Sequence, residues 1–329
     1  MPTRRRALLI LAALTGLAQL SIVVALMVGS IPIGPVEVLS TVFGDAVGTA
    51  ADVVRSLRLP RALTGFACGG LLALAGALLQ VLLRNPLADP YVLGISGGAG
   101  IGALLAIVVG FGVTGINGLA FVGALAAMLL VFGLAHGEGG WTQSRLLLTG
   151  VIVAAGCGAV VTLMLAIAPE DRLRGMLFWL MGDLSQTAEP QLVLSVLALL
   201  LLITLPFARE LNLLARGADV AQALGVAVRP LRRGVYLAAS LATAAAVTHA
   251  GAIGFIGLIV PHLVRLAAGN DQRLLLPASV LAGGSLLVVA DTLARTLLAP
   301  QQLPVGVLTA LIGVPVFLFL LSRAAPGRG

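Results

Sequence analysis

The chain has 329 residues, of which 59% are hydrophobic and only 10% are charged, and its mean hydropathy is +1.10. Soluble domains carry about a quarter of their residues as charged side chains, so this composition excludes an ordinary water-exposed surface. The formal net charge is +7, but every basic residue is an arginine and the arginines are scattered between apolar runs, which argues against nucleic-acid binding.

Continuous apolar runs divide the chain into ten predicted membrane-spanning helices. In lipid the backbone must bond within its own segment, so apolar runs that do not alternate with period two are expected to be helical. The first run follows Arg4–Arg6 and continues for about 22 residues, longer than the core of a signal peptide, so a retained span is predicted. The predicted spans are 7–28, 61–83, 91–113, 118–135, 145–168, 191–208, 231–250, 255–269, 275–298 and 304–322. The sequence therefore predicts an all-α integral membrane protein with one domain over residues 1–329.

The distribution of arginine sets the expected orientation. Ten crossings put both termini on one side, together with fourteen arginines: Arg4, Arg5, Arg6, Arg84, Arg145, Arg209, Arg216, Arg229, Arg232, Arg233, Arg265, Arg273, Arg323 and Arg328. The other side holds six: Arg55, Arg58, Arg61, Arg172, Arg174 and Arg295. Because basic residues accumulate in cytoplasmic loops, both termini are predicted to be cytoplasmic.

Two stretches and one short span depart from the simple bundle. A charged cytoplasmic loop is expected over about 209–233. The external segment 169–190 contains an apolar, aromatic stretch at 176–181 that predicts a short interfacial helix. The eighth span is short and contains Pro261, so a kink or a partial crossing is expected. Glycines of the third span, such as Gly98 and Gly102, are expected to let helices approach closely.

The sequence lacks the residues that would make this chain an enzyme. The phosphate-binding loop of P-loop ATPases needs a lysine, and the chain contains none, so no ATP or magnesium site is expected here and a separate subunit would have to hydrolyse ATP. Ionisable groups are nearly absent from the middle of the spans, and Asp291 and Arg295 lie near the outer end of the ninth. A secondary carrier driven by an ion gradient would require intramembrane carboxylates, and a non-transporting membrane scaffold is a third possibility.

Five motifs, in order along the chain, resemble the permease family of type II ABC importers, the FecCD/BtuC family of iron–siderophore, haem and vitamin B12 permeases. They are Leu57–Arg61, Arg84–Pro90 with Leu93–Ala99, Arg174–Gly175 with Phe178–Trp179 and Met181–Gly182, Ala223–Val226, and Gly254–His262. The resemblance covers the chain most clearly from Leu57 to Arg323. It implies the type II permease fold with ten spans, in a bacterial inner membrane.

The resemblance also implies a set of partners. These are a second copy of the chain, two ATP-binding subunits that hold ATP and magnesium, a soluble substrate-binding protein and the lipid bilayer, with no nucleic acid and no cofactor in this chain.

The segment 218–226 matches the helix that, in this family, couples the permease to its ATPase. The residues expected to make this contact are Asp219, Ala221, Ala223, Leu224 and Gly225. Asp219 lies in the first turn, where the helix dipole favours an anion. The alternative is an ordinary solvated loop.

Arg55, Arg58 and Arg295 match outer-surface arginines that pair with acidic residues of the binding protein in this family. Charges at the edge of an interface mainly set how fast the two proteins associate and how they align on each other. The alternatives are interfacial anchoring and, for Arg295, an ion pair with Asp291 four residues earlier.

Residues of the translocation path or gate are expected at Arg172, Arg174, Trp179, His249, Gly150 and Gly156. Arginines beside aromatic rings would suit the propionates and ring of haem, although lipid headgroups suit them equally. His249 could contact a metal cargo or be a hydrogen-bonded structural residue, whereas His262 is expected to be structural. The expected function is import of an iron complex, haem first and ferric siderophore second, with cobalamin as the alternative cargo.

Overall fold

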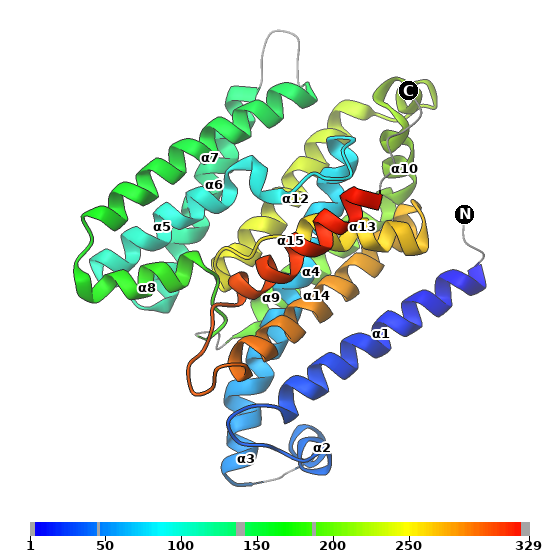
Figure 1. The fold of residues 1–329 in the computed structure, drawn as a ribbon. Coiled ribbons are helices and arrows are strands. Elements are labelled where there is room, and N and C mark those ends of the chain that lie inside the picture. The colour runs from blue at the N-terminus through cyan, green and yellow to red at the C-terminus, as the bar shows by residue number, and fades with distance from the viewer. Residues whose placement is uncertain (1–3, 45–46, 136–141, 186–188, 324–329) are drawn as a thin grey trace.

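The computed structural model describes residues 4–44, 47–135, 142–185 and 189–323, and these residues form helices and connecting loops with no β-strand among them (Figure 1). The longer helices are α1 (Arg4–Met27), α4 (Leu59–Leu82), α5 (Ile95–Val109), α6 (Val113–Ala135), α7 (Gln143–Ala166), α9 (Pro190–Thr204), α12 (Val228–Ala250), α13 (Ile256–Ala268), α14 (Gln272–Thr296) and α15 (Val305–Arg323). The shorter elements are α2 (Pro35–Phe43), α3 (Thr49–Asp52), the π-helix η1 (Val53–Arg58), the 3₁₀-helices η2 (Pro90–Leu93) and η3 (Leu205–Phe207), α8 (Glu170–Leu180), α10 (Ala208–Arg216) and α11 (Ala218–Ala223).

The longer helices coincide one by one with the predicted spans, which confirms the all-α fold. Within the described residues, six helical stretches are long and apolar enough to cross a membrane by length and composition: Arg4–Met27, Thr49–Leu82, Val113–Ala135, Gln143–Ala166, Pro190–Arg216 and Gln272–Thr296. Three shorter apolar helices are Ile95–Val109, Ile256–Ala268 and Val305–Leu320. The expected short eighth span is α13, which has 13 residues with Pro261 inside it.

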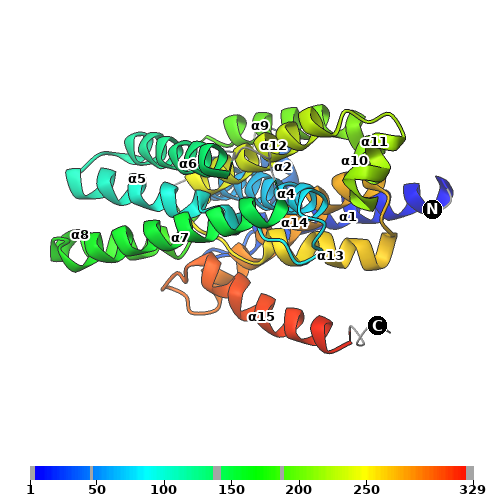
Figure 2. The same ribbon diagram turned by 90° about the horizontal axis from the view of Figure 1, so that it is seen from above.

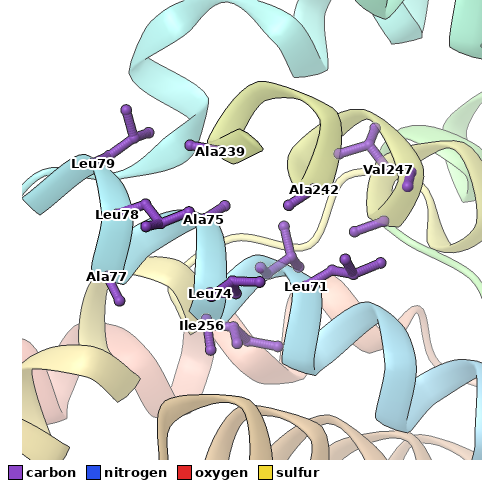
Figure 3. Packing of buried hydrophobic residues seen from close by; sticks show 14 of the residues in the cluster. Leu71, Leu74, Ala75, Ala77, Leu78, Leu79, Ala239, Ala242, Val247 and Ile256 are labelled. Atoms are coloured by element: carbon purple, nitrogen blue, oxygen red, sulfur yellow. The ribbon is translucent and has the colours of Figure 1, made fainter. Parts of the chain in front are cut away.

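Helix α4 forms the centre of the bundle. It carries no charged side chain between Arg61 and Arg84, and Leu71, Leu74 and Leu78 are 0% exposed. Figure 3 shows these leucines directed toward Ala239, Ala242 and Val247 of α12 and toward Ile256 of α13. Helices α12, α13, α14 and α9 pack around α4, so a continuously apolar sequence is required on all its faces.

Glycines allow α4 to contact its neighbours at backbone distance. A Cβ added at Gly76 would lie 1.8 Å from the carbonyl oxygen of Gly257 on α13, and one added at Gly69 would lie 2.3 Å from the carbonyl oxygen of Gly283 on α14. No side chain fits at either crossing. Small residues at such crossings let membrane helices pack closely without a hydrophobic driving force between them.

Glycines also allow α5 and α6 to pack at backbone distance. A Cβ at Gly98 would lie 2.4 Å from the carbonyl oxygen of Gly123, and one at Gly102 would lie 2.0 Å from that of Leu119. The packing role expected for the glycines of this span is therefore confirmed for Gly98 and Gly102.

The bundle has two distinct ends (Figure 1). One end is here called the arginine-rich end. There α10 and α11 lie near the first residues of α1 and α14 and near the last residues of α4 and α13. Arg6 at the start of α1 donates to the carbonyl oxygen of Ala267 at the end of α13, at 3.3 Å. At the opposite end, α2, α3, η1 and α8 lie outside the long helices, and Arg295 of α14 donates to the carbonyl oxygen of Ala25 at the end of α1. Arg6 and Arg295, which are predicted on opposite sides of the membrane, thus lie at opposite ends of the bundle.

Candidate functional site

The predicted coupling segment folds as a short helix held between two glycines. Gly217 (φ 133°) and Gly225 (φ 83°) adopt positive backbone angles on either side of α11, which residues with a side chain rarely adopt. The backbone N–H of Val226 donates to the carbonyl oxygen of Ala221 at 3.0 Å and closes the segment onto itself. The segment therefore projects from the arginine-rich end as a compact loop between α10 and α12 (Figure 2).

The residues expected to contact an ATPase divide into two sets. Asp219, Ala223, Leu224 and Gly225 are exposed, and the Leu224 side chain is 61% exposed. Ala221 is 0% exposed, because its methyl group packs inside the loop. Its assignment to the contact surface therefore does not fit the structure. Val220 and Ala223 are exposed on the same short segment as Leu224, and neighbouring exposed apolar side chains indicate a surface that a partner covers.

An apolar groove of about 570 Å³ adjoins this loop. Its lining includes Ile203, Phe207, Leu213, Leu224, Val226 and Leu231, with Arg209 and Glu210 also contributing. The sequence analysis did not predict the groove, because its walls come from α9, α10 and the start of α12. Leu224 belongs both to the groove and to the exposed tip.

Arg58 lies differently from the expectation of a surface-exposed docking residue. It is 5% exposed, and its guanidinium donates to the carbonyl oxygens of Leu26 (2.7 Å), Met27 (3.2 Å) and Ile31. These carbonyls lie at and just beyond the C-terminal end of α1, where the last four carbonyls of a helix have no partner within it. Arg58 is therefore a buried cap of α1, which corrects the prediction of a docking role.

Arg295 is also held largely inside the protein. Its side chain is 12% exposed, its Nη2 donates to Ala25 O at 3.0 Å, and its Nε lies 3.5 Å from Asp291 Oδ2. The alternative of an ion pair with Asp291 is therefore supported. Asp291 pairs more closely with Arg61, whose Nη2 lies 2.8 Å from Oδ1 and whose Nε lies 2.9 Å from Oδ2. The sequence analysis missed this partner.

Arg55 is the one exposed member of the three arginines expected on the docking surface. Its Nε donates to Thr41 O at 3.0 Å and its Nη2 to Gly44 O at 2.6 Å. These contacts fix Arg55 against the C-terminal end of α2, at the far end of the bundle from α11. A role in docking stays a prediction for Arg55.

Helix α8 carries the arginine and aromatic residues expected at the mouth of a path. It spans 170–180, six residues earlier at its start than the stretch predicted from the sequence. Arg174 lies over the Phe178 ring, with Cζ 5.6 Å from the ring centre, and Arg172 Nε lies 3.2 Å from Asp171 Oδ2. Trp179 is half-buried and reaches Gly100 of α5. Both arginines are exposed, at the end of the bundle opposite α11.

The remaining path candidates separate in the structure. The Nδ1 atom of His249 lies 2.9 Å from the carbonyl oxygen of Ala245, so the ring bonds to its own helix while remaining half-buried. Gly150 is buried, and a Cβ there would lie 2.4 Å from Val92 O, so it serves the packing of α7 on η2. Gly156 is exposed with no heavy atom within 4 Å of an added Cβ. Within the described chain, no group of three or more His, Cys, Asp or Glu side chains could hold a metal ion.

Helices α7 and α15 lie on the same side of α4, away from α9 and α12 (Figure 2). Their free faces are apolar: Leu148, Ile152 and Leu163 of α7 are 63%, 62% and 60% exposed, and Leu311 and Leu318 of α15 are 65% and 59% exposed. Two largely uncovered apolar helices on one side of a membrane bundle leave room for lipid or for a second subunit.

Known proteins resemble this chain over nearly its whole length. A model of the FecCD transport family matches residues 10–323. The cobalamin import system permease protein BtuC of Halobacterium salinarum is 45% identical over 279 residues, covering 83% of this chain and 74% of that protein. The hemin transport system permease protein HmuU of Yersinia pestis is 40% identical over 284 residues, covering 83% of this chain and 84% of that protein. A metal-chelate type ABC transporter solved in an inward-facing conformation superimposes with a TM-score of 0.82 at 33% identity, covering 96% of this chain and 99% of that chain.

Proposed function

Because the chain belongs to the FecCD transport family and is an ABC importer permease, we propose that its cargo is a metal chelate of the tetrapyrrole class, haem first and cobalamin second. The observation that carries this proposal is that relatives named for hemin and for cobalamin import each align with more than four-fifths of the chain. Ferric siderophore, the second expectation from the sequence, is the third cargo to test.

The features of α8 favour haem. Haem is a flat aromatic ring with two carboxylates, and α8 presents two exposed arginines beside Phe178 and Trp179 at the end of the bundle opposite α11. Guanidinium groups pair with carboxylates in a bidentate geometry, and aromatic rings stack on the macrocycle. Sequence identity favours cobalamin, because the permease named for cobalamin import is 45% identical to this chain and the one named for hemin transport is 40% identical.

The energy for transport comes from separate ATP-binding subunits that dock at the arginine-rich end. Leu224 and Ala223 at the tip of the coupling loop, with Val220, provide an apolar contact that exposed arginines surround. Closure of the ATPase dimer on ATP moves this loop, and the movement switches which end of the path is open. This end faces the cytoplasm, in accordance with the excess of arginine there.

A second copy of the chain covers the apolar side formed by α7 and α15. The path then lies between the two copies, with Gly156 on the exposed face of α7 and with α8 at its outer mouth. Walls of small apolar residues suit a bulky cargo, because a site that bound it tightly would hold it in place.

A soluble binding protein delivers the cargo at the opposite end, where Arg55 is the exposed arginine of the predicted docking set. The variant Arg55→Glu should slow association of the binding protein, and the loss should shrink as salt rises. The same loss at all salt concentrations would contradict an electrostatic docking role.

An ion-gradient carrier is the rival from another class. It would use a carboxylate that gains and loses a proton, and the buried Asp291 is instead paired with Arg61 and Arg295. These contacts hold the carboxylate between the start of α4 and the end of α14, where it serves the packing of the bundle.

The cargo is tested by reconstitution of the permease with its ATP-binding subunits and binding protein in proteoliposomes. Uptake of haem, cobalamin and a ferric siderophore is compared in the same preparation, with ATP present. Haem uptake well above the other two is the expected result, cobalamin uptake supports the second candidate, and uptake of the siderophore alone or of none of the three refutes the tetrapyrrole assignment.

A further inference from the structure

The arginine-rich end contains a second cavity, separate from the apolar groove beside α11. It has a volume of about 900 Å³ and opens between α1, α4, α10, α13 and the start of α14. Four arginines line it: Arg6, Arg84, Arg216 and Arg265. We call this cavity the arginine basin.

The charge of the basin is largely uncompensated. Asp271 is the acidic residue in its lining, and its Oδ1 accepts from Asn212 Nδ2 at 2.9 Å and from the backbone N–H of Arg273 at 3.1 Å. Among the described residues, Arg84, Arg216 and Arg265 have no carboxylate within 4.0 Å. Several cations around one hollow repel one another and attract an anion.

Two arginines of the basin are held in place by the fold. The Nη2 of Arg265 donates to Gln80 Oε1 at 2.8 Å, and Gln80 in turn donates to Leu258 O at 3.1 Å. Arg6 donates to Ala267 O at 3.3 Å. Arg84 follows α4 with a φ of 49°, an uncommon backbone angle for a residue with a side chain. The guanidinium groups therefore converge because of tertiary structure and not by chance on a solvated face.

The basin also offers oxygen acceptors. Gln272 lines it, is 2% exposed, and its Oε1 has no hydrogen-bond partner among the described residues. An unpaired buried amide oxygen is costly unless a ligand or water supplies a donor. A ligand that combines a phosphate with a hydroxyl group would satisfy the arginines and Gln272 together.

Exposed apolar side chains flank the cavity. Leu266, which lines it, is 64% exposed, and Leu8 and Leu9 on the first turns of α1 are 59% and 61% exposed. Figure 2 shows the start of α1 and the end of α13 beside one another at this end of the bundle. Acyl chains could therefore run along α1 and α13 from a headgroup in the basin.

We infer that the arginine basin binds the headgroup of an anionic glycerophospholipid, with its phosphodiester on the arginines and a headgroup hydroxyl on Gln272. Basic pockets between helices at the cytoplasmic side of membrane proteins hold such headgroups. An acidic segment of the ATP-binding subunit is the competing occupant, but exposed leucines beside the arginines match a lipid better than an acidic protein loop.

The experiment is native mass spectrometry of the permease released from nanodiscs of equal parts phosphatidylglycerol and phosphatidylcholine. The double variant Arg84→Gln/Arg216→Gln removes two charges from the basin. Its matched control, Arg145→Gln/Arg229→Gln, removes two exposed arginines at the same end that do not line the basin. The variant Arg84→Lys/Arg216→Lys keeps the charge and tests whether the fold is intact.

The expected result is one phosphatidylglycerol retained in preference to phosphatidylcholine on the wild type, the control and the lysine variant. Its affinity should fall about 30-fold in the glutamine variant, since each basic residue near a lipid surface contributes about 1 kcal/mol. Equal retention in the glutamine variant overturns the inference, as does equal loss in the control. Displacement of the lipid by millimolar inorganic phosphate would identify a soluble-anion site instead. Loss of ATP-binding subunit attachment with unchanged lipid retention would identify a protein-docking surface.

Discussion

Arg61 and Asp291 are 230 residues apart in the chain and form a two-pronged ion pair, with Nη2–Oδ1 and Nε–Oδ2 distances of 2.8 and 2.9 Å. The pair joins the start of α4 to the end of α14, and the side chains are 12% and 5% exposed. Arg295 adds a second cation to the same carboxylate. Arg58 of η1 caps α1 nearby, so these side chains hold α1, α4 and α14 together at the end of the bundle opposite α11.

Replacement of this buried carboxylate should destabilise the bundle. Asp291→Asn leaves Arg61 and Arg295 without their counter-charge, and removing one partner of a buried pair costs about 3–5 kcal/mol. Thermal unfolding of the detergent-solubilised protein, followed by light scattering or dye binding, should occur at a clearly lower temperature. Asp171→Asn is the control, because the Asp171–Arg172 pair is 74% and 46% exposed and such pairs contribute under about 1 kcal/mol. Equal shifts for both variants would contradict the account.

The capping role of Arg58 gives a second prediction. In Arg58→Gln, carbonyls at the end of α1 lose a charged donor, and such hydrogen bonds contribute about 1.5–3 kcal/mol each. Cleavage of the 28–34 connection by a protease should accelerate as the end of α1 detaches. The exposed Arg55→Gln should change the cleavage rate much less. A slower association with the binding protein in Arg58→Gln, with no change in protease sensitivity, would instead favour the original docking assignment.

The coupling loop gives a third prediction. Ala223→Glu/Leu224→Glu places two charges on the exposed apolar tip and should abolish transport and its coupling to ATP hydrolysis while the permease remains inserted in the membrane. The conservative pair Ala223→Ser/Leu224→Met should retain both activities. Uptake and ATPase rates in proteoliposomes measure the difference, and normal uptake by the charged variant would refute the assignment.

The crossing of α4 and α13 gives a fourth prediction. Gly76→Ala would place a methyl carbon 1.8 Å from the backbone oxygen of Gly257, so the helices must separate and the yield of folded protein should fall sharply. Gly16→Ala is the control, because no heavy atom lies within 4 Å of a Cβ there, and alanine is the better helix former by about 1 kcal/mol. Size-exclusion chromatography after extraction distinguishes the two, and similar yields would show that α4 and α13 do not cross as described.

The fold was largely predictable because a membrane span requires a long run of apolar residues, which is visible in the sequence. The structure has a helix at each predicted span. The short helices α2 and α3 were missed, since segments of nine and four residues carry too few apolar positions to distinguish them from loops. The arrangement of α11 as a helix was anticipated, but the inward orientation of Ala221 depends on the turn at Gly217 and on how α10 packs.

The contacts of the arginines could not be predicted from sequence. Arg55 and Arg58 are three residues apart and look alike in the sequence, yet one is exposed and the other caps α1. The helix spacing of Asp291 and Arg295 suggested their pairing, whereas nothing local relates Asp291 to Arg61. The arginine basin was missed for the same reason, because Arg6, Arg84 and Arg265 come from three separate helix ends.

The central claim is that this permease moves its cargo only when a separate ATP-binding subunit drives it. The most direct measurement is uptake of labelled haem or cobalamin against a gradient by proteoliposomes that contain the purified chain alone, with and without its ATP-binding subunits, at constant ion gradients. Uptake that requires both those subunits and hydrolysable ATP is the predicted result. Uphill uptake by the chain alone, driven by an imposed proton or sodium gradient, would contradict the account.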